Sequence, residues 1–303
     1  MVIIVTGSNG IIGQQIIIQL LLEYPTAEFI LINRHRRYWN NKRIKTVELN
    51  LIDQTLVQNE LLFSKYKPDL LFHLSWVTEH ANYLDALDNL KWERATINLI
   101  NSFYQSGGKR FIGLGTSLEY DWNCNIPFNE KTSPVNGNNT LYGKSKLNVF
   151  NHLEAQKNIS FIWGRVFFVF GPKQSKTRLI PTIVNNILYG GKPITINRNL
   201  KRDYISTFEI ANQIILLQKS NYSGPVNICT GRSLKLGEII NFIEELSQKN
   251  ATLSPITLKK NSEIKNISGD IDIIHKYFPK YNYSIDEFKS DLLKTIVEIK
   301  NEK

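Results

Sequence analysis

The chain has 303 residues, 42% of them hydrophobic, which is enough for a core in one large domain or two smaller ones. Its 37 basic and 27 acidic residues give a net charge of +10, but the basic residues are scattered, so nucleic-acid binding is not expected. Two cysteines (Cys124 and Cys229) give no disulfide framework or zinc spacing, and no apolar run approaches the ~20 residues of a membrane span, so we expect a cytoplasmic protein without a metal site or membrane contact.

Short β-rich runs alternate with helical patterns through the first half of the chain. Strands are predicted over 2–6, 29–32, 46–49, 69–74, 110–114 and 160–166, and helices over 11–22, 53–65, 83–105 and 142–156. Strands that alternate with helices indicate a parallel sheet covered on both faces. The predicted fold class is therefore α/β, a Rossmann doubly wound parallel sheet.

After Gly171-Pro172 the pattern is less regular. Short strands are expected near Ile194, Tyr204 and Val226, and helices over 179–188, 207–218, 236–246 and 285–299. This mixture predicts a smaller C-terminal α+β lobe. We place the two domains at 1–166 and 167–303 and expect their boundaries to interleave.

A glycine-rich turn directly follows the first predicted strand and opens the first helix. Gly7 permits a tight turn, Gly10 lets the backbone approach a pyrophosphate, and Gly13 allows the helix to pack closely on the strand. The positive end of the helix then faces the anion. The predicted dinucleotide contacts in this turn are Gly7, Asn9, Gly10, Ile11, Ile12 and Gly13.

The end of the second strand bears on the choice of cofactor. An NAD-preferring site usually has Asp or Glu there to hold the ribose 2′-hydroxyl. Here the sequence is Asn33-Arg34-His35-Arg36-Arg37, without a carboxylate. Because arginine can pair with a 2′-phosphate, we expect NADP(H) rather than NAD(H), with Asn33 and Arg34 as contacts and Arg37 as a second candidate.

Tyr142 and Lys146 lie one helical turn apart on the same face of a predicted helix. A phenol with a pKa near ~10 is a poor acid–base group at neutral pH, and a nearby cation lowers that pKa. Thr116 follows a predicted strand at the carboxyl edge of the sheet, where open α/β sheets bind ligands, and can donate a hydrogen bond to a substrate oxygen. Together these residues suit proton transfer beside a hydride carrier.

These motifs resemble the extended short-chain dehydrogenase/reductase family, the NAD(P)-dependent epimerase/dehydratases of nucleotide sugars. The matching pieces, in family order, are TGSNGIIG, PDLLFHL, GTSLEY, YGKSK, GRVFFVFGP, RDYI and VNICTG. The resemblance implies that Thr116, Tyr142 and Lys146 are catalytic, and that Tyr142 and Lys146 also contact the cofactor. It further implies cofactor contacts at Asn50, Leu51, Leu74 and Ser75, substrate contacts at Trp76, Ser117, Arg178 and Arg202, and a homodimer formed through helices 83–105 and 142–156. His80 and Tyr83 follow the fourth predicted strand and are candidates for sugar contacts, with loop packing as the alternative for both.

Differences from the family at the predicted catalytic turn reduce the number of reactions that we expect. Family members that eliminate water resemble Thr-Asp-Glu there, whereas this chain has Thr116-Ser117-Leu118, so a 4,6-dehydratase is not expected. Members that epimerise and reduce GDP-sugars carry a cysteine where Leu118 stands. Phe168 departs from the asparagine common in the family, which removes one expected polar contact to the substrate.

A C4 reductase and a C4 epimerase both remain. A reductase exchanges its cofactor, often as NADPH, whereas an epimerase keeps it bound, most often as NAD, so the arginine-rich segment favours a reductase. The segment from His73 to Trp76 and the pair Phe167-Phe168 resemble a branch that includes 4-keto-6-deoxyhexose reductases. We therefore expect reduction of a nucleotide-linked 4-keto-6-deoxy sugar with NADPH. The alternatives are a 4-epimerase with bound NAD and a non-catalytic NADP(H)-binding sensor or scaffold.

Overall fold

The computed structural model describes residues 1–77, 83–124, 126–157, 159–190, 193–251, 253–254 and 266–301, and all structural statements refer to these residues. The chain divides into two compact units whose segments interleave along the sequence. Unit 1 contains Met1–Asp121, Ser133–Val166 and Ala211–Val226, and unit 2 contains Trp122–Thr132, Phe167–Ile210 and Asn227–Lys303.

Unit 1 is built on a seven-stranded sheet with the order β11-β6-β5-β4-β1-β2-β3. Its strands are β1 (Val2–Thr6), β2 (Glu28–Asn33), β3 (Ile44–Glu48), β4 (Leu70–His73), β5 (Arg110–Thr116), β6 (Ser160–Val166) and β11 (Gly224–Ile228). The neighbouring strands pair in parallel from β6 through β5, β4, β1 and β2 to β3. Strand order reverses between β1 and β4, and ligands bind at the carboxyl ends of the strands at such a point. The predicted doubly wound α/β fold is confirmed.

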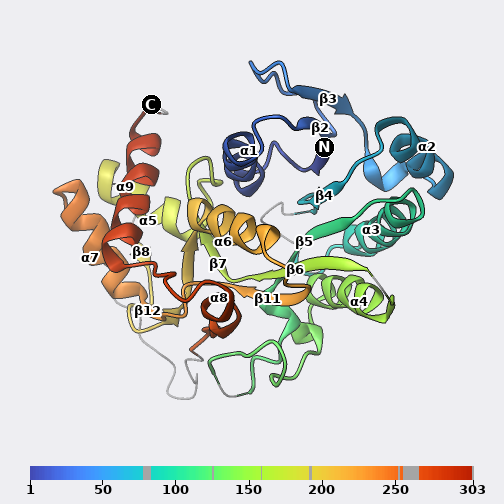
Figure 1. Ribbon diagram of the computed structural model, residues 1–303. Helices are drawn as coiled ribbons and strands as arrows, with labels where there is room; N and C mark the ends of the chain where they lie inside the picture. The colour runs from blue at the N-terminus through green and yellow to red at the C-terminus, as the bar shows by residue number, and fades with distance from the viewer. Residues whose placement is uncertain are drawn as a thin grey trace. The chain divides into compact units, whose positions relative to one another are not determined.

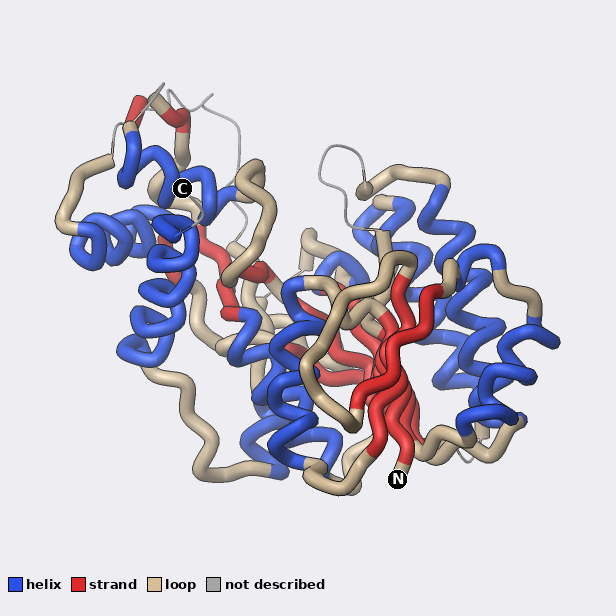
Figure 2. The backbone as a smooth tube through the Cα atoms, turned by 90° about the horizontal axis from the view of Figure 1, so that it is seen from above, coloured by secondary structure: helices blue, strands red, loops and turns tan. Residues whose placement is uncertain are grey.

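Helices lie on both sides of this sheet (Figure 2). They are α1 (Ile11–Glu23), α2 (Leu56–Tyr66), α3 (Asp88–Gln105), α4 (Leu141–Ala155) and α6 (Thr207–Lys219), with short 3₁₀ turns η1 (Leu51–Asp53), η2 (Ser117–Glu119) and η3 (Gly137–Asn139). Phe63, Phe103 and Phe150, from α2, α3 and α4, share one buried cluster with strand residues such as Leu71 and Phe111. Because side chains alternate along a strand, the neighbouring strand positions point to the opposite face.

Two helix starts differ from the sequence prediction. Helix α3 begins at Asp88 rather than Tyr83, because residues 83–85 form a turn. The Asn89 side-chain amide holds this segment by donating to the carbonyls of Tyr83 (2.6 Å) and Ala86 (2.9 Å). Helix α2 begins at Leu56 rather than at residue 53, because Thr55 and Gln58 form a capping box that fixes its first turn. Periodicity alone does not reveal such side-chain caps.

The strand near Val226, predicted to lie in the C-terminal lobe, is instead β11 at the edge of the main sheet. The Arg110 guanidinium on β5 donates to the carbonyls of Leu217, Ser220 and Tyr222, which fixes the segment that leads into β11. These bonds join residues more than a hundred positions apart, so local pattern could not predict them.

Unit 2 is the smaller α+β unit. Its helices are α5 (Leu179–Tyr189), α7 (Leu236–Ser247), α8 (Asp272–Tyr277) and α9 (Ile285–Asn301). Its paired strands are β7 (Phe168–Phe170) with β10 (Tyr204–Ser206), β9 (Lys201–Arg202) with β12 (Leu234–Lys235), and β8 (Ile194–Thr195) with β13 (Leu253–Ser254). Helices α5, α7 and α9 bury a shared apolar cluster. Figure 1 labels most of these elements along the chain.

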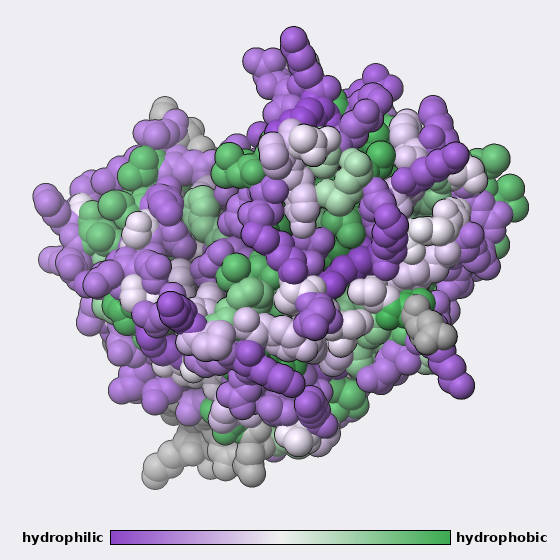
Figure 3. All heavy atoms as spheres, viewed as in Figure 1, coloured by the Kyte–Doolittle hydropathy of each residue, from purple (hydrophilic) through white to green (hydrophobic). Residues whose placement is uncertain are grey.

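Hydrophilic side chains cover much of the face drawn in Figure 3, with apolar residues in scattered patches between them. Among the described helices, none combines the length and apolarity needed to cross a membrane.

Candidate active site

The glycine turn between β1 and α1 is packed so closely that two of its positions cannot hold a side chain. Gly7 has φ +71°, and a Cβ there would lie 2.7 Å from the Leu74 carbonyl carbon and the Ser75 nitrogen. A Cβ at Gly13 would lie 2.3 Å from the Gly7 carbonyl oxygen. The turn therefore contacts both the segment after β4 and its own helix through backbone alone.

The first turn of α1 is available to an anion. Gly10 is the N-cap, and no side chain caps this helix. Uncapped amide groups and the helix dipole together favour a negatively charged group at this end. Asn9 links the turn to the end of β2, because its backbone amide donates to Asn33 Oδ1 (3.3 Å) and its side chain donates to the His35 carbonyl (2.9 Å).

A cavity of about 310 Å³ opens over this turn, entirely within unit 1. It is lined by Gly7, Asn9, Gly10, Ile11, Ile12, Gly13, Ile32, Asn33, Arg34, His35, Leu49, Leu51, Leu74, Ser75, Trp76, Trp92 and Leu114. Most residues predicted to contact the cofactor are brought together here, and Trp76, predicted to contact substrate, joins them. The sequence did not predict five of the lining residues: Ile32, His35, Leu49, Trp92 and Leu114.

The residues present suit a dinucleotide. The cavity lining combines the glycine turn with apolar side chains, and the buried Asn9 Oδ1 has no hydrogen-bond partner within the described chain. Arg34 is exposed at the rim, whereas Arg37 lies over the Trp39 ring at 5.3 Å and does not line the cavity. No carboxylate is among the lining residues.

Tyr142 and Lys146 project from the first turns of α4. Thr140 caps this helix by accepting from the Gly143 amide (3.0 Å), and the Tyr142 amide donates to the Leu84 carbonyl (2.8 Å). The Tyr142 ring makes edge contacts with the rings of Tyr83 (5.2 Å) and Trp76 (6.4 Å). The structure thus gathers three of the predicted site residues into one aromatic cluster.

Lys146 is almost fully buried, with 4% of its surface exposed. Its Nζ donates to the Leu114 carbonyl on β5 (2.7 Å) and lies 3.7 Å from the centroid of the Trp76 ring. Burial lowers the pKa of Lys146 to about 7, although the negative charge of Glu119 opposes this shift. At neutral pH this ammonium therefore loses its proton far more readily than an exposed lysine does.

Thr116 ends β5 and starts η2. Its hydroxyl oxygen accepts from the Leu118 amide (3.3 Å), and its own amide donates to Glu119 Oε1 (2.9 Å). Ser117 is the next residue of the turn and is buried. Gly143 allows α4 to approach this turn, because a Cβ there would lie 2.5 Å from the Leu118 carbonyl oxygen.

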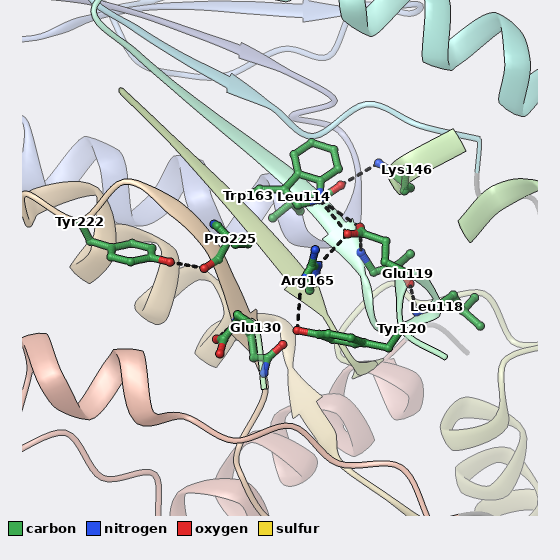
Figure 4. Close-up of polar contacts among 12 residues, drawn as sticks. Leu114, Leu118, Glu119, Tyr120, Glu130, Lys146, Trp163, Arg165, Tyr222 and Pro225 are labelled. Atoms are coloured by element: carbon green, nitrogen blue, oxygen red, sulfur yellow. Dashed lines mark hydrogen bonds and ion pairs between the residues drawn. The ribbon is translucent and has the colours of Figure 1, made fainter. Parts of the chain in front are cut away.

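Glu119, the last residue of η2, carries a fully buried carboxylate for which the sequence motifs predicted no role. Figure 4 shows it between Trp163 and Arg165 of β6: it accepts from the indole nitrogen (3.0 and 3.1 Å) and from Arg165 Nε (2.7 Å). Arg165 also donates to the Tyr120 hydroxyl (3.1 Å). An arginine inside the apolar strand sequence SFIWGRV was the signal for a buried acidic partner.

Of the remaining predicted residues, Asn50 and Leu51 belong to unit 1. Asn50 precedes η1 and donates to Asp53 (2.6 Å), and Leu51 is buried at the cavity wall. His80 lies outside the described residues. Arg178 and Arg202 belong to unit 2, where Arg202 lies over the rings of Trp122 (5.8 Å) and Phe168 (5.3 Å).

Residues 3–229 match the model of the NAD dependent epimerase/dehydratase family, and the chain belongs to this family. It is 22% identical to the dTDP-D-glucose 4,6-dehydratase of Mus musculus, and the alignment covers 83% of this chain and 76% of the relative. The match confirms the family that the sequence motifs indicated.

Solved structures share the fold over the whole chain. A UDP-N-acetylglucosamine 4-epimerase from Methanobrevibacter ruminantium, in complex with UDP-N-acetylmuramic acid, is 22% identical with a TM-score of 0.84, covering 99% of this chain and 98% of that one. A UDP-glucose 4-epimerase from Thermus thermophilus, in complex with NAD, is 18% identical with a TM-score of 0.77, covering 100% of both chains. At these identities the similarity establishes the architecture.

Gly13→Ala should abolish dinucleotide binding, because the new Cβ would displace the Gly7 carbonyl and open the turn. We expect a loss of stability of roughly 1–3 kcal/mol, measured by urea unfolding, and no binding of NADH or NADPH by fluorescence titration. Gly107→Ala is the control: a Cβ there meets nothing within 4 Å, and the strain of alanine at a φ of +85° should lower stability without changing cofactor binding. Wild-type cofactor affinity in Gly13→Ala would contradict the close packing.

Lys146→Met should change how stability depends on pH. The folded-state pKa of Lys146 lies below the ordinary value, so between pH 7 and about 10 the unfolded chain holds a proton that the folded chain lacks. The wild type therefore loses stability relative to the variant as pH falls through this range, by up to a few kcal/mol, since one pKa unit corresponds to about 1.4 kcal/mol.

Urea unfolding at several pH values measures this difference. Lys144→Met removes an exposed lysine from the same helix and controls for the loss of one positive charge. A pH-dependent difference no larger than that of the control would contradict the burial of Lys146.

Proposed function

We propose that this protein uses NADPH to reduce the C4 ketone of a nucleotide-linked 4-keto-6-deoxy sugar. The observation that carries the proposal is the group around Lys146. The ammonium is bound to the Leu114 carbonyl, two residues before Thr116, and lies beside Trp76, which both lines the dinucleotide cavity and contacts the Tyr142 ring. Tyr142 and Lys146 do not line the cavity themselves, but their contacts Trp76 and Leu114 do, which links an acid–base pair to a cavity suited to a hydride carrier.

In this mechanism Thr116 and Tyr142 hydrogen-bond the ketone oxygen, and Tyr142 gives it a proton from the phenol oxygen. When bound, the nicotinamide supplies the hydride for C4. The Lys146 ammonium stabilises the phenolate that remains on Tyr142, because a positive charge nearby favours the ionised phenol. The Thr116 oxygen accepts from the Leu118 amide, which directs the hydroxyl hydrogen away from that amide and toward another acceptor.

Elimination of water would need a further acid–base group at the catalytic turn. The turn from Thr116 to Tyr120 contains one carboxylate, Glu119. This carboxylate is 0% exposed and accepts from Trp163, Arg165 and the Thr116 amide. A fully buried carboxylate whose oxygens are taken up by three donors is not available to a substrate, so a simple hydride transfer fits the turn better than dehydration.

Preference for NADPH is supported by the rim of the cavity. Asn33, Arg34 and His35 line it at the end of β2, where an NAD-preferring site usually has a carboxylate. The exposed Arg34 can pair with a 2′-phosphate, whereas the nearby Arg36 lies 3.9 Å from Glu48 and the Arg37 guanidinium lies over Trp39.

We assign cofactor binding to unit 1 and the nucleotide sugar to unit 2. Within unit 2, Arg202 joins a cluster with Trp122 and Phe168 and offers a cation for a diphosphate; Arg178, the N-cap of α5, is the second candidate. Substrate contacts at His80 and Tyr83, a homodimer and a cytoplasmic location stay predictions.

A 4-epimerase with bound NAD is the second candidate function. It is favoured by the solved relatives, among them the 4-epimerase of Thermus thermophilus in complex with NAD. An epimerase interconverts saturated nucleotide sugars without net change of cofactor, whereas a reductase consumes NADPH with a ketone substrate. A non-catalytic NADP(H)-binding role would give neither reaction.

The experiment that tests the proposal follows NADPH oxidation with a panel of 4-keto-6-deoxy nucleotide sugars and identifies products by NMR. We expect NADPH consumption with at least one ketone. Tyr142→Phe should lower turnover by roughly 10²–10⁴-fold with unchanged NADPH affinity, because it removes the proton donor but keeps the ring. Tyr66→Phe, on α2, is the matched control. Full turnover in Tyr142→Phe would reject the assignment.

Arg34→Ala should weaken NADPH binding by about 10–100-fold and leave NADH binding nearly unchanged, because only NADPH carries the 2′-phosphate and a charge-assisted hydrogen bond contributes about 1.5–3 kcal/mol. Arg36→Ala removes a neighbouring exposed cation as the control. Fluorescence titration with both cofactors measures the ratio. Equal losses for NADH and NADPH would show that Arg34 does not read the 2′-phosphate.

A further inference from the structure

The Lys146 ammonium is enclosed by aromatic rings. Its Nζ lies 3.7 Å from the Trp76 centroid, 5.6 Å from that of Trp163 and 6.0 Å from that of Tyr142. Its hydrogen bond goes to the Leu114 carbonyl, visible in Figure 4 beside Trp163. The Trp76 contact is much the closest of the three, and the negative face of an indole attracts an ammonium more strongly when water is excluded.

The charged and titratable groups around Lys146 come from three elements. On η2, Glu119 raises the pKa of Lys146, but its oxygens are bound to Trp163, Arg165 and the Thr116 amide. On β4, burial and then the charge of Lys146 lower the pKa of His73 to about 3, so this ring is neutral. On α4 itself lies Tyr142. Within the described chain no carboxylate forms an ion pair with Lys146, so after the Leu114 carbonyl the Trp76 face is the nearest group that favours the ammonium.

Trp76 is itself fixed in place. Its Nε1 donates to Asn89 Oδ1 (2.8 Å), and Asn89 is fully buried with its amide nitrogen bound to the carbonyls of Tyr83 (2.6 Å) and Ala86 (2.9 Å). The Trp92 ring stacks beside it at 6.2 Å. The indole nitrogen of Trp76 is therefore hydrogen-bonded to Asn89, and one face of the ring contacts the Lys146 ammonium.

We propose that Trp76 is a positioning residue: its indole face holds the Lys146 ammonium at the carboxyl end of β5, and Asn89 holds the indole. This role differs from the substrate contact expected from sequence. It rests on the proposed function in so far as Lys146 serves the reaction, but the contact itself can be tested without substrate.

The test is NMR of the full-length protein with ¹³C-labelled lysine side chains, titrated from pH 5 to 11. The Lys146 signal is assigned by its loss in Lys146→Met. In the wild type we expect a ring-current shift of the Lys146 ε-protons. In Trp76→Leu that shift should fall to the smaller part that Trp163 and Tyr142 contribute. The pKa of Lys146 should fall by about one further unit, because the variant removes a contact that favours the charged form. Trp76→Phe, which keeps a ring, should give intermediate values.

Trp39→Leu is the control for the loss of a tryptophan elsewhere in unit 1 and should leave the Lys146 signal unchanged. If Trp76→Leu does not fold, Trp76→Phe and Asn89→Ala carry the test: the first should reduce the ring-current shift and the second should do so with Trp76 still present. A Lys146 shift and titration equal to the wild type in the folded variants would overturn the proposal.

Turnover gives a second readout once an accepted ketone is known. Trp76→Leu should lower kcat more than it raises KM, and the decline of kcat with rising pH should begin at lower pH, because less of Lys146 is charged. Trp76→Phe should restore part of the rate. If no ketone is reduced, the proposed reaction fails while the NMR result stands; if the NMR signals do not respond, the positioning role fails whatever the reaction.

Discussion

The buried carboxylate of Glu119 organises the catalytic end of the sheet. A charge without water must be paired and hydrogen-bonded, and breaking such a pair costs about 3–5 kcal/mol. Glu119 meets this need with Arg165, the Trp163 indole and the Thr116 amide, which come from β5 and β6. A Cβ at Gly115 would lie 2.2 Å from its Oε1, so the strand itself leaves space for it.

The contacts of Glu119 also affect two residues of the proposed active site, Thr116 and Lys146. The interaction with the Thr116 amide fixes the direction in which β5 ends, and Trp163, held by Glu119, forms one wall around Lys146. The same carboxylate partly offsets the effect of burial on the pKa of Lys146. One ion pair, too deep to contact a ligand itself, thus supports both the hydroxyl and the ammonium of the proposed active site.

The fold and the local chemistry constrain function to different degrees. Membership of the epimerase/dehydratase family and the reversal of strand order between β1 and β4 account for a dinucleotide cavity at this position. They do not choose among reduction, epimerisation and dehydration, because relatives with this fold carry different activities in their names. The side chains that bear on the type of reaction are Glu119, which is bound to Arg165, and Arg34, which lies at a cavity rim without carboxylates. In unit 2 they include Phe168, whose ring lies beside Arg202.

The sequence by itself determined the features that depend on near neighbours in the chain. Alternating strand and helix patterns predicted the doubly wound sheet, the glycine spacing predicted the turn below the cavity, and the four-residue spacing predicted Tyr142 and Lys146 on one helix face. Only the tertiary structure decided that β11 completes the main sheet, that α3 starts at Asp88, that Glu119 pairs with Arg165, and that Lys146 rests on Trp76. Each of these features depends on side-chain contacts, most of them between segments far apart in the chain. A buried charge or a helix cap pairs with a group that the folded chain brings near it. Periodicity and propensity describe only near neighbours in the sequence, so they do not predict such partners.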